Sequence, residues 1–399
     1  MLVSKNFGEI VTFTRASARW RYSNGGVLVQ DAANVPSLDY DPITLAVRGL
    51  LIEDNRTNLF KYSQDFTNSA WNKQGFALTP NVAVAPDGTT TASLLVPTAA
   101  AGVSHNLEQN GITGAGAIGV TNVQSYFVKA AGYSRVAIWW PNTGAGDSFD
   151  LSTGTRIAGA GGTISPLGNG WFRIASPYAQ PTTAGSSSRL YVLEPGTTGP
   201  AAWVGAADGV SGIYVWGGQI EVGAYPLSYT PTTAAQVTRA VDNAIITDLS
   251  KIAFNANEGT LYLEAVAPAG LRTDGGSQFC IGLDDNGFNN AISIGRSAAR
   301  AFRAQIKSNN VDQGAMISGT WADNTNAKVA LAYSASGASL CWNGGAPVST
   351  PGAVSVPPLT RLRLGTNIID GSAVWNSAIR NLRYIPRRLS STELQNLTA

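Results

Sequence analysis

Two adjacent tryptophans, Trp139 and Trp140, end the apolar run SRVAIWW and lead into the polar loop PNTG. Because neighbouring side chains on a strand point to opposite faces of a sheet, only one of the two indoles can enter a core. An exposed indole can lie flat on the apolar face of a pyranose ring while an amide such as Asn142 binds the hydroxyls. We therefore take Trp139, Trp140 and Asn142 as candidate carbohydrate-binding residues. Core packing or a protein interface is the alternative for either ring.

The stretch GLDDNGFNN brings the side-chain oxygens of Asp284, Asp285 and Asn286 together in one turn. Calcium prefers such carboxylate and amide oxygens, so the three residues are candidate metal ligands. The same residue types also favour turns by themselves, because they tolerate left-handed backbone and accept hydrogen bonds from nearby N–H groups. We favour the plain turn and expect no cofactor, with calcium as the alternative.

Histidine-dependent catalysis has one candidate, because His105 is the single histidine of the chain. It lies in the strand-like stretch AGVSHNLEQ, which has no nucleophile elbow, so we expect a structural role. The sequence contains no HExxH motif, CxxC motif or phosphate loop. Two carboxylates far apart in sequence can still meet and hydrolyse a glycosidic bond, but no closely spaced pair marks such a site. We expect a protein that is not an enzyme.

The charge, hydropathy and cysteine content of the chain exclude further classes of function. The 27 basic and 25 acidic side chains leave a net charge of +2, which is too weak a field to attract nucleic acid or an anionic membrane. Eighteen consecutive apolar residues do not occur, so we expect no membrane insertion. Cys280 and Cys341 lie in strand-like stretches, where we expect two buried free thiols, and a disulfide is the alternative.

The elements that position these residues are predicted to be strands, because 44 glycines and 19 prolines divide the chain into short pieces. Because side chains alternate between the two faces of a strand, the sequence predicts which residues share a face. Leu190 and Val192 share one face of RLYVLE and Tyr191 the other, and in GIYVWGGQIEV the glycines after Trp216 indicate a bulge. KVALAYSASGASLCWNGG is typical of a hairpin. The capping pair formed by Ser390 and Glu393 predicts one short C-terminal helix.

These patterns predict an all-β fold of two consecutive antiparallel β-sandwich or jelly-roll domains. Residues 1–58 contain too few apolar side chains for a core and are predicted to be a short extended attachment segment. Residues 59–235 are predicted to form the first sandwich and residues 251–399 the second. Pro226 and Pro231 cannot donate to a ladder, so we expect the first sheet to end there and residues 236–250 to be a linker.

Several stretches together resemble a family of tailed-bacteriophage virion proteins, which includes tail fibre, head fibre and minor structural proteins. Its shared opening is similar to FTRASARWRYSNGGVLVQDAANVPSLDYDP followed by RGLLIEDNRTNLFKYSQDFTNSAW. Its first sandwich, which resembles a carbohydrate-binding module, is similar to PDGTTTASLL, YFVKAAGYSRV, FDLSTGT and GNGWFRI, and closes with WGGQIEVGAYPLSYTPTT and VTRAVD. GTLYLEAV and IRNLRYIPRRLSSTELQNLT look like the two ends of a concanavalin A-like (laminin G-like) domain.

This resemblance implies a non-enzymatic virion protein, a fibre or decoration protein assembled in the cytoplasm of the bacterial host, whose lectin-like domains adhere to host-surface glycans. Residues 1–58 would bind other capsid or tail proteins. A homo-oligomer such as a trimer is expected, because several weak sugar sites together gain avidity. Two alternatives stay open: a purely structural capsid or tail decoration or cement protein, and a glycan depolymerase.

Overall fold

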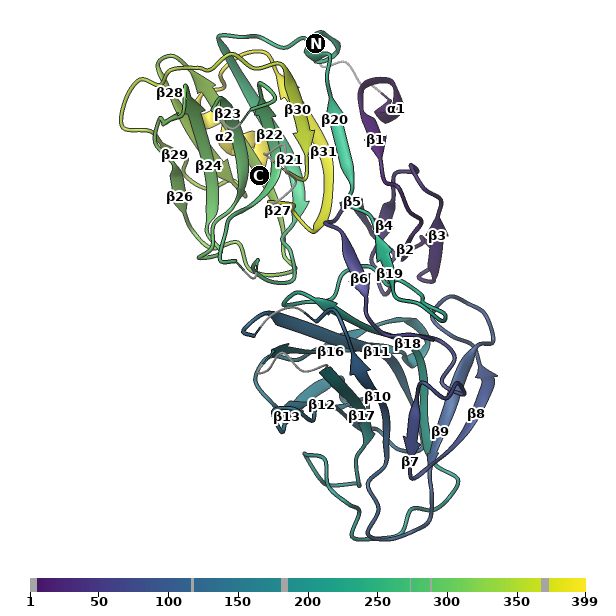
Figure 1. Ribbon diagram of the computed structural model, residues 1–399. Helices are drawn as coiled ribbons and strands as arrows, with labels where there is room; N and C mark the ends of the chain where they lie inside the picture. The colour runs from purple at the N-terminus through teal and green to yellow at the C-terminus, as the bar shows by residue number, and fades with distance from the viewer. Residues whose placement is uncertain (1–5, 116–117, 181–185, 273, 288, 367–372) are drawn as a thin grey trace.

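The computed structural model describes residues 6–115, 118–180, 186–272, 274–287, 289–366 and 373–399. Within these residues the chain is almost entirely β-structure, and its strands pair antiparallel in four large sheets. Figure 1 shows these sheets as two β-sandwiches, with strands of the N-terminal segment between and beside them. The predicted all-β class is confirmed. None of the described helices is long and apolar enough to cross a membrane.

The first sandwich consists of two six-stranded sheets, which we call sheet I and sheet II. Sheet I has the order β14-β13-β12-β17-β10-β7 and sheet II the order β15-β16-β11-β18-β9-β8. The strands of sheet I are β7 (Asn72–Gln74), β10 (Asn106–Ile112), β12 (Arg135–Trp140), β13 (Ala145–Asp150), β14 (Thr155–Ala158) and β17 (Ser186–Val192). Those of sheet II are β8 (Phe76–Ala83), β9 (Ala92–Pro97), β11 (Thr121–Ala131), β15 (Thr163–Pro166), β16 (Phe172–Ala179) and β18 (Gly212–Val222).

The strand faces of the first sandwich follow the predicted alternation. Leu190 and Val192 pack into the core between the two sheets, whereas Tyr191 belongs to a small separate cluster on the outer face of sheet I. Trp216 lies on the outer face of sheet II, while its neighbour Val215 enters the core. The predicted bulge after Trp216 is also present, because the register between β11 and β18 shifts there. Alternation thus separates core from outer face correctly on these strands.

The second sandwich consists of a seven-stranded sheet III and an eight-stranded sheet IV. Sheet III has the order β29-β28-β27-β21-β31-β5-β4, and sheet IV the order β1-β20-β30-β22-β23-β24-β25 with β26 also paired to β24. The strands of sheet III are β4 (Leu38–Tyr40), β5 (Val47–Ile52), β21 (Glu258–Val266), β27 (Asn326–Ser334), β28 (Gly337–Trp342), β29 (Val348–Ser349) and β31 (Ser377–Ile385). Those of sheet IV are β1 (Thr12–Thr14), β20 (Asn243–Ile246), β22 (Gln278–Asp284), β23 (Ala291–Arg296), β24 (Phe302–Ser308), β25 (Val311–Asp312), β26 (Met316–Ser318) and β30 (Arg361–Leu364).

Three local predictions are confirmed in this sandwich. β27 and β28 form the predicted hairpin. The C-terminal helix α2 (Ser391–Thr398) begins with a capping box, in which the Ser390 hydroxyl accepts the Glu393 N–H and the Glu393 carboxylate accepts the Ser390 N–H. Cys280 and Cys341 are buried free thiols, so the disulfide alternative does not apply.

The N-terminal segment differs from the expected extended arm. After the short helix α1 (Phe7–Ile10), β1 pairs with β20 and so joins sheet IV, while β4 and β5 extend sheet III beyond β31. β2 (Arg19–Tyr22) and β3 (Leu28–Asp31) form a separate hairpin. The second sandwich is therefore built from two separate stretches of chain, and the first sandwich is inserted between them (Figure 1).

Residues 236–250 also differ from expectation, because they form strands instead of a linker. β19 (Val237–Arg239) pairs with β6 (Arg56–Asn58), and β20 lies between β1 and β30. The preceding segment folds back over the outer face of sheet II, where the ring of Tyr229 lies 4.9 Å from that of Trp216. Burial of Leu227 and Tyr229 stabilises this path, which the prolines alone did not indicate. We call residues 12–58 and 223–246 together the collar.

A cluster of buried ion pairs holds the collar together. Asp242 accepts hydrogen bonds from the guanidiniums of Arg15, at 3.3 Å, and Arg19, and from the backbone N–H of Glu53 at 2.7 Å. The Glu53 carboxylate lies 3.4 Å from both Arg19 and Arg239. Burial alone would raise the pKa of Glu53, but these two guanidiniums lower it overall. The stretches RASAR, GLLIE and TRAVD therefore meet in one group of charges, which we call the collar cluster.

Asp39 on β4 makes a pH-dependent contribution to stability. Asp39 is 6% exposed, accepts the Tyr22 N–H at 3.0 Å and lies 3.6 Å from Arg48. Burial raises the pKa of its carboxyl from 3.8 to about 6, although Arg48 acts in the opposite direction. The folded state therefore binds this proton more readily than the unfolded state. The contribution of protonated Asp39 to the free energy of unfolding is therefore complete below about pH 4, and it is lost as the pH rises through about 6.

We accordingly expect the Asp39→Asn variant to gain stability relative to the wild type as the pH rises from about 4 to about 7. Asparagine cannot ionise, so it does not lose the contribution that aspartic acid loses. Urea denaturation of both proteins at a series of pH values measures the difference between their free energies of unfolding. The contributions of all other titrating groups cancel in this difference. A difference that stays constant with pH would contradict the raised pKa.

Candidate functional site

The outer face of sheet I carries one row of polar and aromatic side chains from four adjacent strands. The register pairs Trp139 on β12 with Arg189 on β17, Arg189 with Glu108 on β10, and Glu108 with Asn72 on β7. Residues directly opposite each other in an antiparallel pair share a face. The four side chains therefore follow one another across the strands.

A second row, formed by Tyr191, Asn106 and Gln74, lies beside the first on β17, β10 and β7. The Asn106 amide donates to Oε1 of Gln74 at 2.9 Å. Within the described residues, Oδ1 of Asn106 is buried without a hydrogen-bond partner. We call the two rows together the Trp139 face, which consists of Asn72, Gln74, Asn106, Glu108, Trp139, Arg189 and Tyr191.

Arg189 is fixed at the centre of the Trp139 face. Its Nε donates to Oε1 of Glu108 at 2.7 Å and its Nη1 to the hydroxyl of Tyr191 at 3.2 Å. Burial lowers the pKa of Arg189, but the bonds to Glu108 and Tyr191 outweigh it and raise the pKa overall. The Arg189 side chain remains 32% exposed and the Glu108 side chain only 6%. A ligand would therefore meet a charged donor that is already oriented, at little further entropic cost.

The indole of Trp139 lies over a strand that leaves room for it. Its cross-strand neighbour on β13 is Gly146, and a Cβ atom at that position would lie 2.9 Å from Cε3 of the indole. The same Cβ atom would lie 2.0 Å from the carbonyl oxygen of Ile138, so a larger residue would also force β12 and β13 apart. Trp139 is half-buried, so the ring packs against the strand and keeps part of its surface accessible. A supported, partly exposed indole of this kind can hold an apolar ring face.

The other two candidate carbohydrate-binding residues are placed differently. Trp140 is 1% exposed and stacks on Tyr178, with 4.2 Å between the ring centroids. Core packing, the alternative interpretation, therefore applies to Trp140. Asn142 is exposed in the turn that follows β12. Of the adjacent tryptophans, the strand alternation thus leaves Trp139 alone on the outer face.

The three candidate metal ligands contact arginine and the turn itself. Asp284 is fully buried and accepts a hydrogen bond from Nε of Arg363 at 2.7 Å, and Oδ1 of Asn286 accepts from Nη2 of the same guanidinium at 3.2 Å. Asp285 accepts from the amide of Asn290 at 2.7 Å. A cation in this turn would face the Arg363 charge, so the plain turn fits better. Among the residues described, no group of three or more His, Cys, Asp or Glu side chains could hold a metal ion.

His105 is enclosed by aromatic rings. It is fully buried, its Nε2 lies 3.2 Å from the carbonyl oxygen of Thr98, and Trp203 packs edge-on at 4.7 Å between ring centroids. Burial lowers the pKa of His105, so the ring is neutral at physiological pH. These contacts give the side chain a packing role in the first sandwich.

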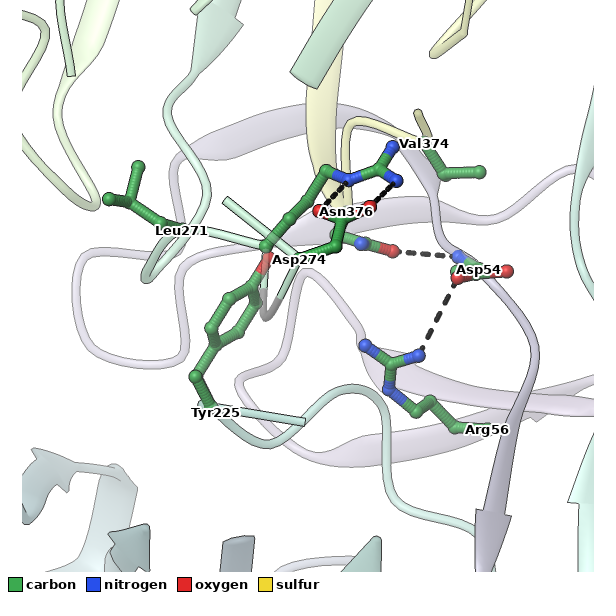
Figure 2. A pocket seen from close by; sticks show the side chains of 9 residues that line it. Asp54, Arg56, Tyr225, Leu271, Asp274, Val374 and Asn376 are labelled. Carbon is green, nitrogen blue, oxygen red and sulfur yellow. Dashed lines mark hydrogen bonds and ion pairs between the residues drawn. The ribbon is translucent and has the colours of Figure 1, made fainter. Parts of the chain in front are cut away.

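A cavity lies where the collar meets the second sandwich (Figure 2). Figure 2 shows Arg56 and Asn376 both turned toward Asp54, with Tyr225 on the opposite side. We call this cavity of about 120 Å³ the junction pocket; it is lined by Asp54, Arg56, Ala224, Tyr225, Leu271, Arg272, Asp274, Val374 and Asn376.

Each carboxylate of the junction pocket lies beside its own guanidinium. Nη1 of Arg56 is 3.5 Å from Asp54, and Nε of Arg272 donates to Asp274 at 2.9 Å. The bond from Arg272 lowers the pKa of Asp274 to about 2, so this carboxyl is ionised at neutral pH. Glycoside hydrolysis needs one carboxyl that stays protonated to act as the acid. Asp274 does not fit that role.

The chain belongs, by its fold, to the all-β proteins built from antiparallel β-sandwiches. No protein family model matches the sequence, and no curated protein matches it.

Solved structures show only a weak likeness to the chain, and three of them serve as examples. The CBM40 of the Ruminococcus gnavus IT-sialidase bound to alpha2,3 sialyllactose is 12% identical, with a TM-score of 0.31, over 36% of this chain and 84% of that one. The native heptameric SAP-like pentraxin from Limulus polyphemus is 11% identical, with a TM-score of 0.30, over 36% and 70%. Trypanosoma rangeli sialidase in complex with the inhibitor DANA is 12% identical, with a TM-score of 0.30, over 77% and 60%. Similarity this weak identifies neither a family nor a ligand.

Sequence reasoning found Trp139 but missed the residues beside it. Arg189 and Glu108 lie 81 positions apart and meet only because β17 pairs with β10. The one available signal was alternation, which places Tyr191 on the face opposite the core and hence Arg189 with it. Which strands neighbour β17 could not be read from that pattern.

Proposed function

We propose that this protein is a non-enzymatic structural protein of a bacteriophage virion, a fibre or decoration protein, and that it adheres to host-surface glycans through the Trp139 face. The observation that carries the adhesive role is the placement of a supported indole next to an oriented guanidinium, a carboxylate and amides. Sugars present apolar ring faces together with hydroxyls that both donate and accept hydrogen bonds. The Trp139 face offers a partner for each of these groups.

The virion assignment is supported by the resemblance of the collar stretches to phage virion proteins. Because those stretches are folded partly into sheets III and IV and partly between the two sandwiches, attachment to capsid or tail proteins would use the outer surface of the collar instead of a free arm. Electron microscopy of phage particles labelled with an antibody against the second sandwich tests this assignment. Label on the capsid or tail supports it, and unlabelled particles from a lysate that contains the protein would contradict it.

Trp139→Ala is expected to abolish glycan retention. Affinity electrophoresis in gels that contain dextran, mannan, galactomannan, polygalacturonate or bacterial lipopolysaccharide measures this as mobility relative to a polysaccharide-free gel. The wild type should be retarded in at least one gel, and the variant should lose affinity at least about 10-fold because a central aromatic anchor is removed.

Trp139→Phe is the matched control, because it retains an aromatic ring at the same place and should keep part of the retardation. Circular dichroism spectra of the three proteins at the assay temperature, well below their unfolding transitions, should be the same and would show that the loss is local. Glycan binding is refuted if the wild type migrates identically in every gel. Shorter polysaccharide chains after incubation would instead indicate the depolymerase alternative.

A further inference from the structure

The Trp139 face is elongated in one direction. Its first row crosses four adjacent strands, from Trp139 on β12 to Asn72 on β7. Neighbouring strands lie about 4.8 Å apart, so the row spans roughly 14 Å. A single pyranose ring stacked on the indole would not reach the side chains on β10 and β7. The length of the row therefore suits a chain of several sugars better than a terminal sugar.

The charges on the Trp139 face cancel. The carboxylate of Glu108 is bonded to Arg189, and the other polar members are amides and a phenol. A ligand carboxylate at Arg189 would also face Glu108, and a ligand ammonium at Glu108 would face Arg189. Either charge would weaken an ion pair that is already made. Uncharged hydroxyls meet no such conflict, because they can donate to one partner and accept from the other.

The far end of the row has capacity for further hydrogen bonds. Asn72 is exposed and lies opposite Glu108. In the second row, Gln74 on β7 is also exposed, and its amide can hydrogen-bond a ligand hydroxyl. This combination of donors and acceptors away from Trp139 is what a chain continuing across β17, β10 and β7 would use.

Given the glycan binding proposed above, we infer that the Trp139 face takes an uncharged oligosaccharide whose chain lies across the strands, with one ring on Trp139 and the chain continuing over Arg189 and Glu108 toward Asn72. The ligand class is therefore a neutral polysaccharide bound within the chain. A single charged sugar at a chain end does not match the length or the charge of the row.

The test uses the full chain and two probe sets: length-fractionated hydrolysates of the neutral polymers dextran, mannan and galactomannan, and of the acidic polymer polygalacturonate. Isothermal titration should give affinity for at least one neutral set that rises with length and then levels off. Asn72→Ala should weaken the longer fragments roughly 3- to 10-fold, the worth of about one hydrogen bond, and leave the shortest fragment unchanged. Gln313→Ala is the control, because Gln313 belongs to the second sandwich, and it should leave the affinity for every fragment unchanged.

Two results would overturn the chain orientation while leaving glycan binding intact. The first is affinity that is independent of length and of Asn72→Ala. The second is binding of polygalacturonate fragments alone. Absence of binding by every fragment and by every gel-embedded polysaccharide would instead remove the proposed function itself, so the two failures are distinguishable.

Discussion

Asp242→Asn is expected to lower the free energy of unfolding by about 3–5 kcal/mol, because it leaves the buried guanidinium of Arg15 without the carboxylate that it contacts and leaves Arg19 with Glu53 as its remaining carboxylate contact. Arg15 and Arg19 are both 1% exposed, and both bond to the Asp242 carboxylate. Asparagine keeps the shape and can still accept the N–H of Glu53, so the expected cost arises from the lost charge. Urea denaturation followed by tryptophan fluorescence measures it.

Asp274→Asn is the matched control for this loss. It is the same isosteric change at another aspartate paired with an arginine, but the Asp274 side chain is 56% exposed. Water solvates the exposed Asp274 carboxylate in the wild type and so weakens its ion pair with Arg272, and we expect a change of about 0–1 kcal/mol. Similar losses in the two variants would show that burial of the collar cluster has no special weight.

Trp216→Ala is expected to cost about 3–5 kcal/mol through the cavity it leaves on the outer face of sheet II. Trp216 is fully buried, its ring lies 5.3 Å from that of Phe127, and its Nε1 donates to Oγ1 of Thr91 at 3.1 Å. Trp20 on the β2–β3 hairpin also packs against it. The substitution should therefore loosen the collar from the first sandwich as well as lower stability.

The comparison variant is Trp139→Ala, which makes the same deletion at a half-buried ring. We expect it to cost about 1–2 kcal/mol, because less apolar surface returns to water. Denaturation curves of both variants under one set of conditions give the difference. If Trp139→Ala proves as costly as Trp216→Ala, the outer face of sheet I is packed more tightly than its exposure indicates.

The sequence predicted strands and their faces well, because alternation is a local property. Tyr191 against Leu190 and Trp216 against Val215 follow directly from the period of two. The collar could not be predicted in this way. Arg15 and Asp242 are 227 residues apart, and a low apolar content was interpreted as an extended arm although buried ion pairs hold the segment in place.

The candidate site shows the same division between local and distant information. Trp139 and Trp140 were predicted together, since two adjacent indoles must face opposite ways, and the structure places Trp139 on the outer face and Trp140 in the core. Its partners depend on the order of strands in sheet I, and hydrophobic pattern does not determine which strand pairs with which. The turn at Asp284 was ambiguous for a different reason: oxygen ligands and turn formers are the same residue types, and only the position of Arg363 separates the two interpretations.

The insertion of the first sandwich into the second has a mechanical consequence. The chain enters the first sandwich through β6 and leaves it through β19, and these two strands are paired with each other, with the hydroxyls of Thr57 and Thr238 2.8 Å apart. A pulling force on the first sandwich is thus shared by two strands that are bonded along their length. Tension between the sandwiches is resisted by a double connection instead of a single tether.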